Sequence, residues 1–332
     1  MKLLSAMKNR LGLYSPLIFG QTKSLGLPNI VIIETTNLCD KECRICVHKN
    51  MTRKQGFMDL GLFKSIVDQI SFAEVIFPYF LGEPLLHKDI YEMIRYCKSK
   101  GLYTSISTDG NLLNEDNCKK IVEAKLDHLQ ISLNSTNKSG YEAIDPKGDF
   151  QAVLENIDRF LSINKGRVDF YVSILNMKCG VKDWQAFVKA WRKKGLEVRF
   201  KFFVDWNAND PSIQEFGSFP ARRRKDVYPC DWLWQQFHVL WDGRVIPCCF
   251  DYDGTQILGD VNVDSIKSIW NGRAYTDMRR AHLNDGAAIS LCSGCNRRRK
   301  QFYEIPFHVI FDASLIYKMR LLYEKSPRKY FG

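Results

Sequence analysis

Three cysteines stand close together near the start of the chain, at Cys39, Cys43 and Cys46. Their spacing is CxxxCxxC, so one short loop can place three thiolates around one face of a cubane iron–sulfur cluster. A structural zinc site usually takes four protein ligands in paired CxxC knuckles, and this loop offers no fourth cysteine. Three ligands leave one iron open, and an open metal position indicates chemistry rather than a structural role.

A second set of cysteines lies nearer the end of the chain, at Cys230, Cys248, Cys292 and Cys295, with Cys249 as a possible substitute for Cys248. Four thiolates can complete the coordination of one 4Fe–4S cluster and leave no open iron. The same four residues would suit a zinc ribbon. Taken alone, the second set does not decide between iron–sulfur and zinc.

The first cysteines follow a short apolar run, and such runs alternate with helical periods up to about residue 204. We expect strands over Val31–Ile33, Val75–Phe80, Tyr103–Ser107, Leu129–Leu133, Val168–Leu175 and Val198–Val204. We expect helices over Leu60–Ile70, Ile90–Lys100, Asp116–Ala124, Phe150–Asn164 and Trp184–Lys194. This order predicts a parallel α/β sheet with its functional groups at the carboxyl ends of the strands.

Polar and turn residues follow several of these strands. Leu81-Gly82-Glu83-Pro84 comes after the second strand, and Thr108-Asp109-Gly110-Asn111 comes after the third. Both segments could also be plain turns that bind nothing. Ser132 and Asn134 on the fourth strand lie two residues apart and therefore on one side, and Ser173 on the fifth strand is a similar candidate. Inward polar side chains in a barrel strand rarely serve packing alone.

Together, the CxxxCxxC loop and the strand-end residues resemble the radical S-adenosylmethionine (radical SAM) enzymes. The resemblance implies a partial (β/α)6 barrel of the TIM type over residues 30–205. It implies that the open iron binds the amino and carboxylate groups of SAM, and that an electron from the cluster produces a 5′-deoxyadenosyl radical. It further implies that SAM is bound by Gly82, Glu83, Thr108, Ser132, Asn134 and Ser173.

The later cysteines, with the hairpin turn Trp241-Asp242-Gly243-Arg244, resemble the auxiliary-cluster extension of SPASM and Twitch proteins. No cysteine follows Cys295, so the shorter Twitch form with one auxiliary cluster is implied. We therefore expect two 4Fe–4S clusters in all, the second held by Cys230, Cys248, Cys292 and Cys295. The small iron–sulfur domain would span residues 206–300, between an N-terminal cap (1–29) and barrel on one side and a basic tail (301–332) on the other.

Two reactions suit a fully ligated auxiliary cluster, and we favour a dehydrogenase, in which the cluster accepts the electron left after hydrogen abstraction. An epimerase or isomerase would instead need a thiol to return a hydrogen atom. Cys179, after the fifth strand, and Cys249 are the candidates for that thiol, although both could be structural. We expect Cys97 and Cys118, on predicted helices, to be packing residues. The sequence assigns no catalytic base.

The substrate class is an expectation from the family. Only 29 residues precede the first strand, too few for the peptide-recognition domain that many peptide-modifying members carry. Members with a single auxiliary cluster act on sugars and aminocyclitols, so we expect a small carbohydrate-like substrate. The net charge of +11 allows it to be anionic. The electron donor would be a protein such as flavodoxin or ferredoxin.

The composition indicates the cellular compartment and the kinds of partner to expect. Eleven cysteines in 332 residues, mostly in ligand-like groups, predict a reducing, cytoplasmic setting, and no apolar run has membrane-spanning length. Residues 1–20 are mildly amphipathic and basic; they could touch a membrane surface, but we favour a helical cap on the fold. The basic runs at residues 222–225 and 297–300 are more often solvated faces than nucleic-acid sites. A zinc and nucleic-acid binding module is the alternative of another class, but it leaves the strand-end residues without a purpose.

Overall fold

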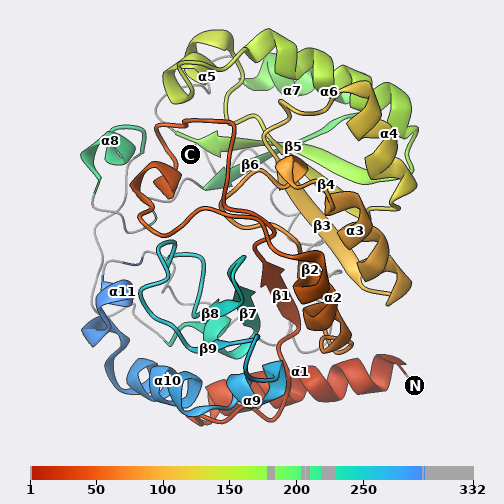
Figure 1. Ribbon diagram of the computed structural model, residues 1–332. Coiled ribbons are helices and arrows are strands. Elements are labelled where there is room, and N and C mark those ends of the chain that lie inside the picture. Colours follow the sequence, from red (N-terminus) through yellow and green to blue (C-terminus); the bar gives the residue numbers. More distant parts are fainter. Residues whose placement is uncertain are drawn as a thin grey trace.

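The computed structural model describes residues 2–177, 184–202, 206, 210–217, 229–293 and 295. The strands of this described part form one sheet in the order β6-β5-β4-β3-β2-β1-β7-β8-β9 (Figure 1). The predicted basic runs and the tail at 301–332 lie outside the described residues.

Six parallel strands form the barrel half of the sheet, and this part of the prediction is confirmed. They are β1 (Ile30–Ile33), β2 (Val75–Phe77), β3 (Tyr103–Thr108), β4 (His128–Ser132), β5 (Asp169–Asn176) and β6 (Glu197–Phe202). Each differs from the expected range by three residues or fewer at either end. Buried aliphatic residues such as Val31, Ile106 and Val172 occupy these strands, because a parallel sheet has both faces covered.

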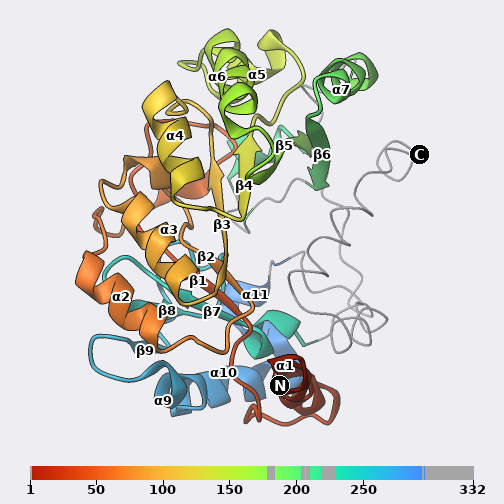
Figure 2. The ribbon, with the colours of Figure 1, turned by 90° about the vertical axis from the view of Figure 1, so that its right-hand side faces the viewer.

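Helices between the strands cover the outer face of this half (Figures 1 and 2). They are α2 (Leu60–Asp68), α3 (Ile90–Ser99), α4 (Glu115–Glu123), α6 (Phe150–Asn164) and α7 (Trp184–Lys193). Side chains of Asp59, Asn114 and Asp149 cap three of them by accepting backbone N–H bonds of the first turn. A further helix, α5 (Lys138–Ile144), was not predicted, because seven residues are too few to show a helical period.

The C-terminal segment extends the same sheet. Strand β7 (Gln236–Val239) pairs in parallel with β1, and β8 (Arg244–Ile246) and β9 (Gly259–Asp260) follow in antiparallel order. The predicted hairpin turn is confirmed, with Gly243 at φ +95° between β7 and β8. Four helices follow or flank these strands: α8 (Pro211–Gln214), α9 (Ile266–Trp270), α10 (Arg273–Asp285) and α11 (Ser290–Ser293). The same sheet contains strands from both sides of residue 206, where the sequence suggested a domain boundary. The division into two domains therefore stays a prediction.

The chain begins with α1 (Lys2–Ile18), whose inner face carries the buried residues Leu13, Tyr14 and Leu17. These pack into a core that includes side chains of β1, β7, α9 and α10. Arg10, also buried, donates from Nε to Glu74 at 2.6 Å. No helix among the described residues is long and apolar enough to cross a membrane.

Candidate active site

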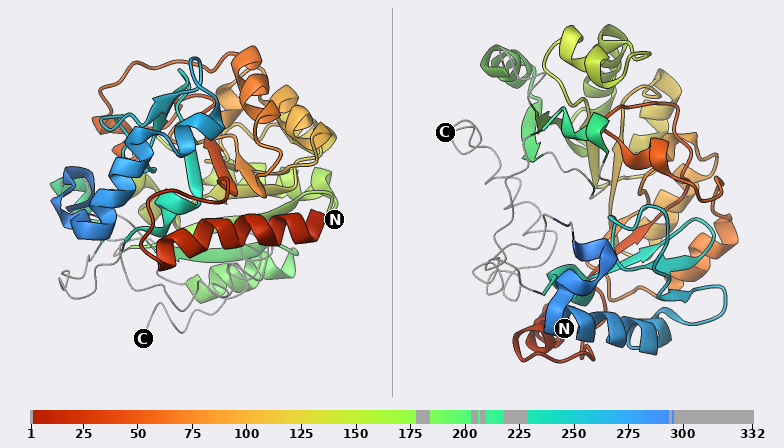
Figure 3. Two further views of the ribbon diagram at one scale, coloured as in Figure 1. Left: turned by 90° about the horizontal axis from the view of Figure 1, so that it is seen from below. Right: turned by 90° about the vertical axis from the view of Figure 1, so that its left-hand side faces the viewer.

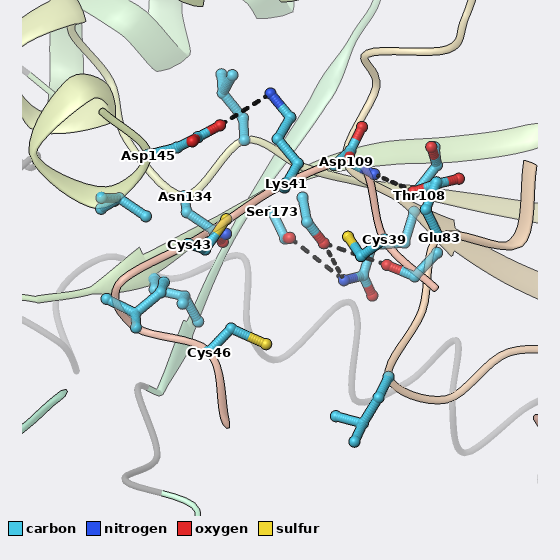
Figure 4. Close-up of a pocket in the computed structure, with 18 of the residues that line it drawn as sticks. Cys39, Lys41, Cys43, Cys46, Glu83, Thr108, Asp109, Asn134, Asp145 and Ser173 are labelled. Carbon is cyan, nitrogen blue, oxygen red and sulfur yellow. Dashed lines mark hydrogen bonds and ion pairs between the residues drawn. The ribbon is translucent and has the colours of Figure 1, made fainter. Parts of the chain in front are cut away.

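A cavity of about 270 Å³ opens at the carboxyl ends of the barrel strands. The three cysteines of the first set line it, together with every residue predicted to bind SAM: Gly82, Glu83, Thr108, Ser132, Asn134 and Ser173. Figure 4 shows Glu83, Thr108, Asn134 and Ser173 around the loop that carries Cys39, Cys43 and Cys46. The fold thus brings residues from β1, β2, β3, β4 and β5 into one place, while their individual roles stay predictions.

The three thiols suit a cationic iron–sulfur core. Burial raises the pKa of Cys39 to about 12, and burial also raises the pKa of Cys43 and of Cys46. Thiolates would therefore need a nearby positive centre, which a cluster provides. Within the part of the chain that the structure describes, no histidine and no fourth cysteine lines this cavity. The donor set fits a cluster with one open iron.

Lys41, inside the cysteine loop, ties the loop to the unpredicted helix α5. Its Nζ donates to the Tyr141 hydroxyl at 2.8 Å and lies 3.1 Å from Asp145 Oδ2, and both members of the ion pair are nearly fully buried. The backbone N–H of Arg44 also donates to the Ile144 carbonyl at 2.8 Å. Sequence reasoning missed Lys41, Tyr141 and Asp145, because a contact across about a hundred residues leaves no local pattern.

Gly82 is tightly packed against the cysteine loop, and the close ligand approach expected of it stays a prediction. A Cβ at this position would lie 2.5 Å from the carbonyl oxygens of Leu38 and Thr36. The neighbour that requires a glycine is therefore the backbone that leads into Cys39. The backbone N–H of Glu83 donates to the same Leu38 carbonyl at 2.8 Å, so the two loops are in direct contact.

Glu83 is buried, and its carboxylate holds two loops together. One oxygen accepts from the backbone N–H of Leu85 at 3.0 Å and the other from that of Asp109 at 2.9 Å. The side chain is thus engaged within the protein, and the backbone oxygen of Glu83 accepts from the backbone N–H of Leu86 at 3.1 Å, so the part that Glu83 plays in binding SAM stays a prediction. Burial raises the pKa of Glu83, as the proximity of Asp109 also does.

An acidic edge lies beside Cys39. Cys39, Asp40 and Asp109 each offer a ligand atom within 4.8 Å of the others. Burial, with a further contribution from Asp40, raises the pKa of Asp109 to about 7. The side-chain amide of Asn111 donates to Asp40 at 2.6 Å. An acidic edge attracts a cationic group, such as the amino group of a bound amino acid.

A polar network forms the floor of the cavity. Gln130 Nε2 donates to Ser132 Oγ at 3.1 Å and to Ser173 Oγ at 3.3 Å, while its Oε1 accepts from Tyr171 and Lys201. Sequence reasoning missed Gln130. This residue lies two positions before Ser132, so the two-residue period of the strand would have placed it on the same side. Lys201 on β6 also lines the cavity, and a single lysine in a strand gave no comparable signal.

Asn134 follows β4 in the left-handed region, with φ +61°. Few residues other than glycine adopt this conformation, and asparagine is the commonest of them. Its backbone N–H donates to the Ser173 carbonyl at 3.0 Å. A left-handed residue at the end of a barrel strand directs its side chain differently from a residue within the strand. The prediction that Ser132 and Asn134 lie on one side of the strand therefore holds only in that both residues line the cavity.

A second cavity collects the four cysteines of the second set. Its described walls are Cys230, Trp232, Leu233, Pro247, Cys248, Phe250, Met278, His282, Leu291, Cys292 and Cys295. Burial raises the pKa of Cys248 well above its usual value, and the nearby thiols of Cys249, Cys230 and Cys292 raise it further. Such a site needs a cationic centre to hold thiolates. Four sulfurs in a mostly apolar enclosure fit a fully ligated cluster.

His282 links two of these cysteines and was not predicted. The backbone N–H of Cys230 approaches His282 Nδ1 at 3.4 Å, and Nε2 lies 3.2 Å from Cys292 Sγ. Because Nδ1 accepts, the proton of the neutral ring is assigned to Nε2, which then donates to the sulfur. A histidine ten residues before a cysteine gave no sequence signal.

The four remaining cysteines belong to neither set of predicted ligands. Cys97 in α3 and Cys118 in α4 are fully buried, which confirms them as packing residues. Cys249 lines neither cavity. Cys179 lies outside the described residues.

Comparison with known proteins agrees with this geometry. Residues 33–178 match the model of the radical SAM superfamily, and residues 230–296 match SPASM, an iron–sulfur cluster-binding domain. The tungsten-containing aldehyde ferredoxin oxidoreductase cofactor-modifying protein of Pyrococcus furiosus is 32% identical over 312 residues, covering 80% of this chain and 86% of that protein. The PqqA peptide cyclase of Gluconobacter oxydans is 28% identical over 310 residues, covering 83% and 84%.

Among solved structures, BtrN in complex with AdoMet and 2-DOIA shares the fold, with a TM-score of 0.55 and 18% identity. The match covers 83% of this chain and 97% of that one. The sequence motifs, the two cysteine-lined cavities and the two family models lead to one conclusion: the chain belongs to the radical SAM superfamily and carries a SPASM domain.

Proposed function

We propose that this radical SAM enzyme is an oxidoreductase that dehydrogenates a small, polar, carbohydrate-like or aminocyclitol-like substrate. The observation that carries the proposal is the separation of the cysteines into two cavities. Three of them share a cavity with polar strand-end side chains, and four share another cavity with apolar side chains. Three ligands suit a site of chemistry, whereas four suit a site of electron transfer.

The net reaction balances with two 4Fe–4S clusters and one SAM. When bound, SAM and the first cluster supply the radical that removes a hydrogen atom from the substrate, and the auxiliary cluster can take the remaining electron. The substrate also loses a proton, so dehydrogenation removes two hydrogens in all. A protein such as flavodoxin or ferredoxin would supply the first electron.

The chain's own residues would bind and orient the two ligands. Asp40 and Asp109 form an acidic edge beside Cys39, which suits the ammonium group of SAM. Asn134 and the Gln130 network with Ser132 and Ser173 would hold hydroxyl and carboxylate groups. Lys201, which also lines the cavity, supports a substrate that carries an anionic group.

Peptide modification is a second candidate, favoured by the named activity of the PqqA peptide cyclase relatives. An epimerase has less support, because Cys249 lines neither cavity. The remaining thiol candidate, Cys179, is outside the described residues.

One experiment separates these reactions. Anaerobically reconstituted enzyme is incubated in deuterated water with SAM, dithionite and a panel of sugar phosphates, aminocyclitols and synthetic peptides, and products are weighed by mass spectrometry. We expect a small-molecule product two hydrogens lighter, without solvent deuterium at the attacked carbon, and unimpaired turnover in Cys179→Ala and Cys249→Ala. A product of unchanged mass that carries one deuterium would establish an epimerase, and turnover of peptides alone would establish the peptide candidate.

A further inference from the structure

The outer face of α1 and the segment after it carries an exposed apolar row. Leu4, Leu11 and Ile18 recur every seven residues, so they line up along one side of the helix. Their side chains are 74%, 53% and 51% exposed. The helix is about 25 Å long at 1.5 Å per residue, and the row runs along most of it.

Two more apolar residues widen this row. Phe19 is 75% exposed at the end of α1, and Leu25 is 78% exposed. The backbone N–H of Leu25 donates to the Gly12 carbonyl at 3.0 Å, so the chain turns back and places Leu25 beside the middle of the helix. Below, these five residues, Leu4, Leu11, Ile18, Phe19 and Leu25, are called the α1 face.

This concentration of apolar surface is unlike the rest of the molecule. Eight large hydrophobic residues are exposed in the described part of the chain, and five of them belong to the α1 face. The opposite side of the same helix is buried in the core through Leu13, Tyr14 and Leu17. The helix therefore already has its place in the fold, and the α1 face is additional apolar surface that packing does not explain.

The segment that carries the α1 face has only positive charges. Residues 1–33 contain four lysines and arginines and no acidic residue, the first acid being Glu34. Lys8 and Lys23 are exposed among the apolar residues, whereas Arg10 is buried against Glu74. Apolar side chains flanked by lysines on a surface helix are the pattern of helices that lie in the headgroup region of an anionic bilayer.

We propose that the α1 face docks the enzyme onto an anionic membrane surface. A second copy of the chain would fit less well, because a symmetric contact would bring Lys8 and Lys23 toward the lysines of the same segment, which has no acid to pair them. Figure 3, left, shows α1 lying along its whole length across the side of the molecule nearest the viewer. In Figure 1, α1 lies below the start of β1, whereas the cysteine loop follows the other end of that strand, so docking leaves the cavity open.

The test is flotation of the full-length, cluster-loaded enzyme with vesicles, at low and at high salt. Vesicles of phosphatidylcholine with about a third phosphatidylglycerol are compared with pure phosphatidylcholine. We expect binding to the anionic vesicles only, weakened by salt. The double variant Lys8→Glu/Lys23→Glu should lower partitioning at least tenfold, since each lysine near such a surface contributes roughly 1 kcal/mol. Phe19→Ser/Leu25→Ser should also lower partitioning at least tenfold.

Matched controls keep the result specific. Lys138→Glu/Lys147→Glu makes the same charge change at side chains that are 73% and 75% exposed near the cavity end. Phe57→Ser removes an exposed aromatic residue that bridges to Thr36, beyond the carboxyl end of β1. Both controls should bind vesicles as the parent does, and iron content should be equal in all variants. Absence of binding to anionic vesicles, equal loss in the controls, or a dimer in solution that Phe19→Ser/Leu25→Ser dissociates would overturn the proposal.

Discussion

Replacing Gly82 by alanine should damage the first cluster site through the protein backbone. The added Cβ would meet the Leu38 and Thr36 carbonyl oxygens at 2.5 Å and Asn37 Cα at 2.9 Å. Ordinary contacts of this kind begin near 3.4 Å, so one loop must move by most of an ångström. All three neighbours are backbone atoms just before Cys39, and none can rotate away. Overpacking of this type costs about 1–3 kcal/mol.

The displacement should appear first in metal content. We expect Gly82→Ala to reconstitute with about four irons rather than about eight, because Cys39 moves while the second cavity is untouched. Iron and sulfide analysis, with electron paramagnetic resonance of each cluster, measures this directly. The melting temperature should fall by roughly 2–4 °C for each kcal/mol lost.

Gly101→Ala is the matched control. Gly101 has φ +73°, and a Cβ there would meet nothing within 4 Å. It should cost about 1 kcal/mol through backbone conformation alone and leave both clusters intact. If Gly82→Ala kept about eight irons and bound SAM normally, the contact between the two loops would not be what requires a glycine. If it kept the irons but lost SAM, the expectation of close ligand approach would be supported instead.

Three further predictions concern the two cavities. Replacing Cys39, Cys43 and Cys46 together by alanine should leave about four irons and abolish SAM cleavage, and zinc in the remaining site at full stoichiometry would refute the electron-acceptor role. Asn134→Ala should weaken SAM binding roughly tenfold, the value of one or two hydrogen bonds, with iron content unchanged. Asn134→Gly separates the effect of the side chain from that of the left-handed backbone. Equal SAM affinity in both variants and the parent would show that Asn134 does not belong to the SAM site. His282→Ala should keep the irons but lower the reduction potential of the auxiliary cluster by roughly 20–60 mV, because a hydrogen-bond donor to sulfur stabilises the more negative reduced state. An unchanged potential in a redox titration would mean that His282 does not donate to Cys292.

The barrel was predictable because its signals are local. Each parallel strand is a buried aliphatic run and each major helix has an amphipathic period, so residues 30–202 could be placed from the sequence almost element by element. Cysteine spacing is also local, and it identified both ligand sets. The helix α5 escaped because seven residues carry too short a period, and Tyr141 was lost with it.

What the sequence did not reveal depends on contacts across long separations. The pairing of β7 with β1 joins residues about two hundred apart, and no local pattern specifies which strand lies beside β1. The Lys41 ion pair with Asp145 is of the same kind. The motif predicts that Glu83 contacts SAM, and it does not specify the two backbone N–H bonds that the Glu83 carboxylate accepts. A motif predicts which residues gather at a site better than it predicts which atom of each one faces the ligand.

The walls of the two cavities give the two cysteine sets different physical tasks. The first cavity combines its thiols with Asp109, Gln130 and other polar groups, so ligands can be bound and oriented beside the sulfurs. The second is enclosed mainly by apolar side chains, including Trp232, Phe250 and Met278, and its four thiols leave little to bind a substrate. Low polarity disfavours any gain of negative charge, so a cluster there would resist reduction unless a donor compensates. His282 is placed to be that donor, which is why its removal should change a potential rather than an affinity.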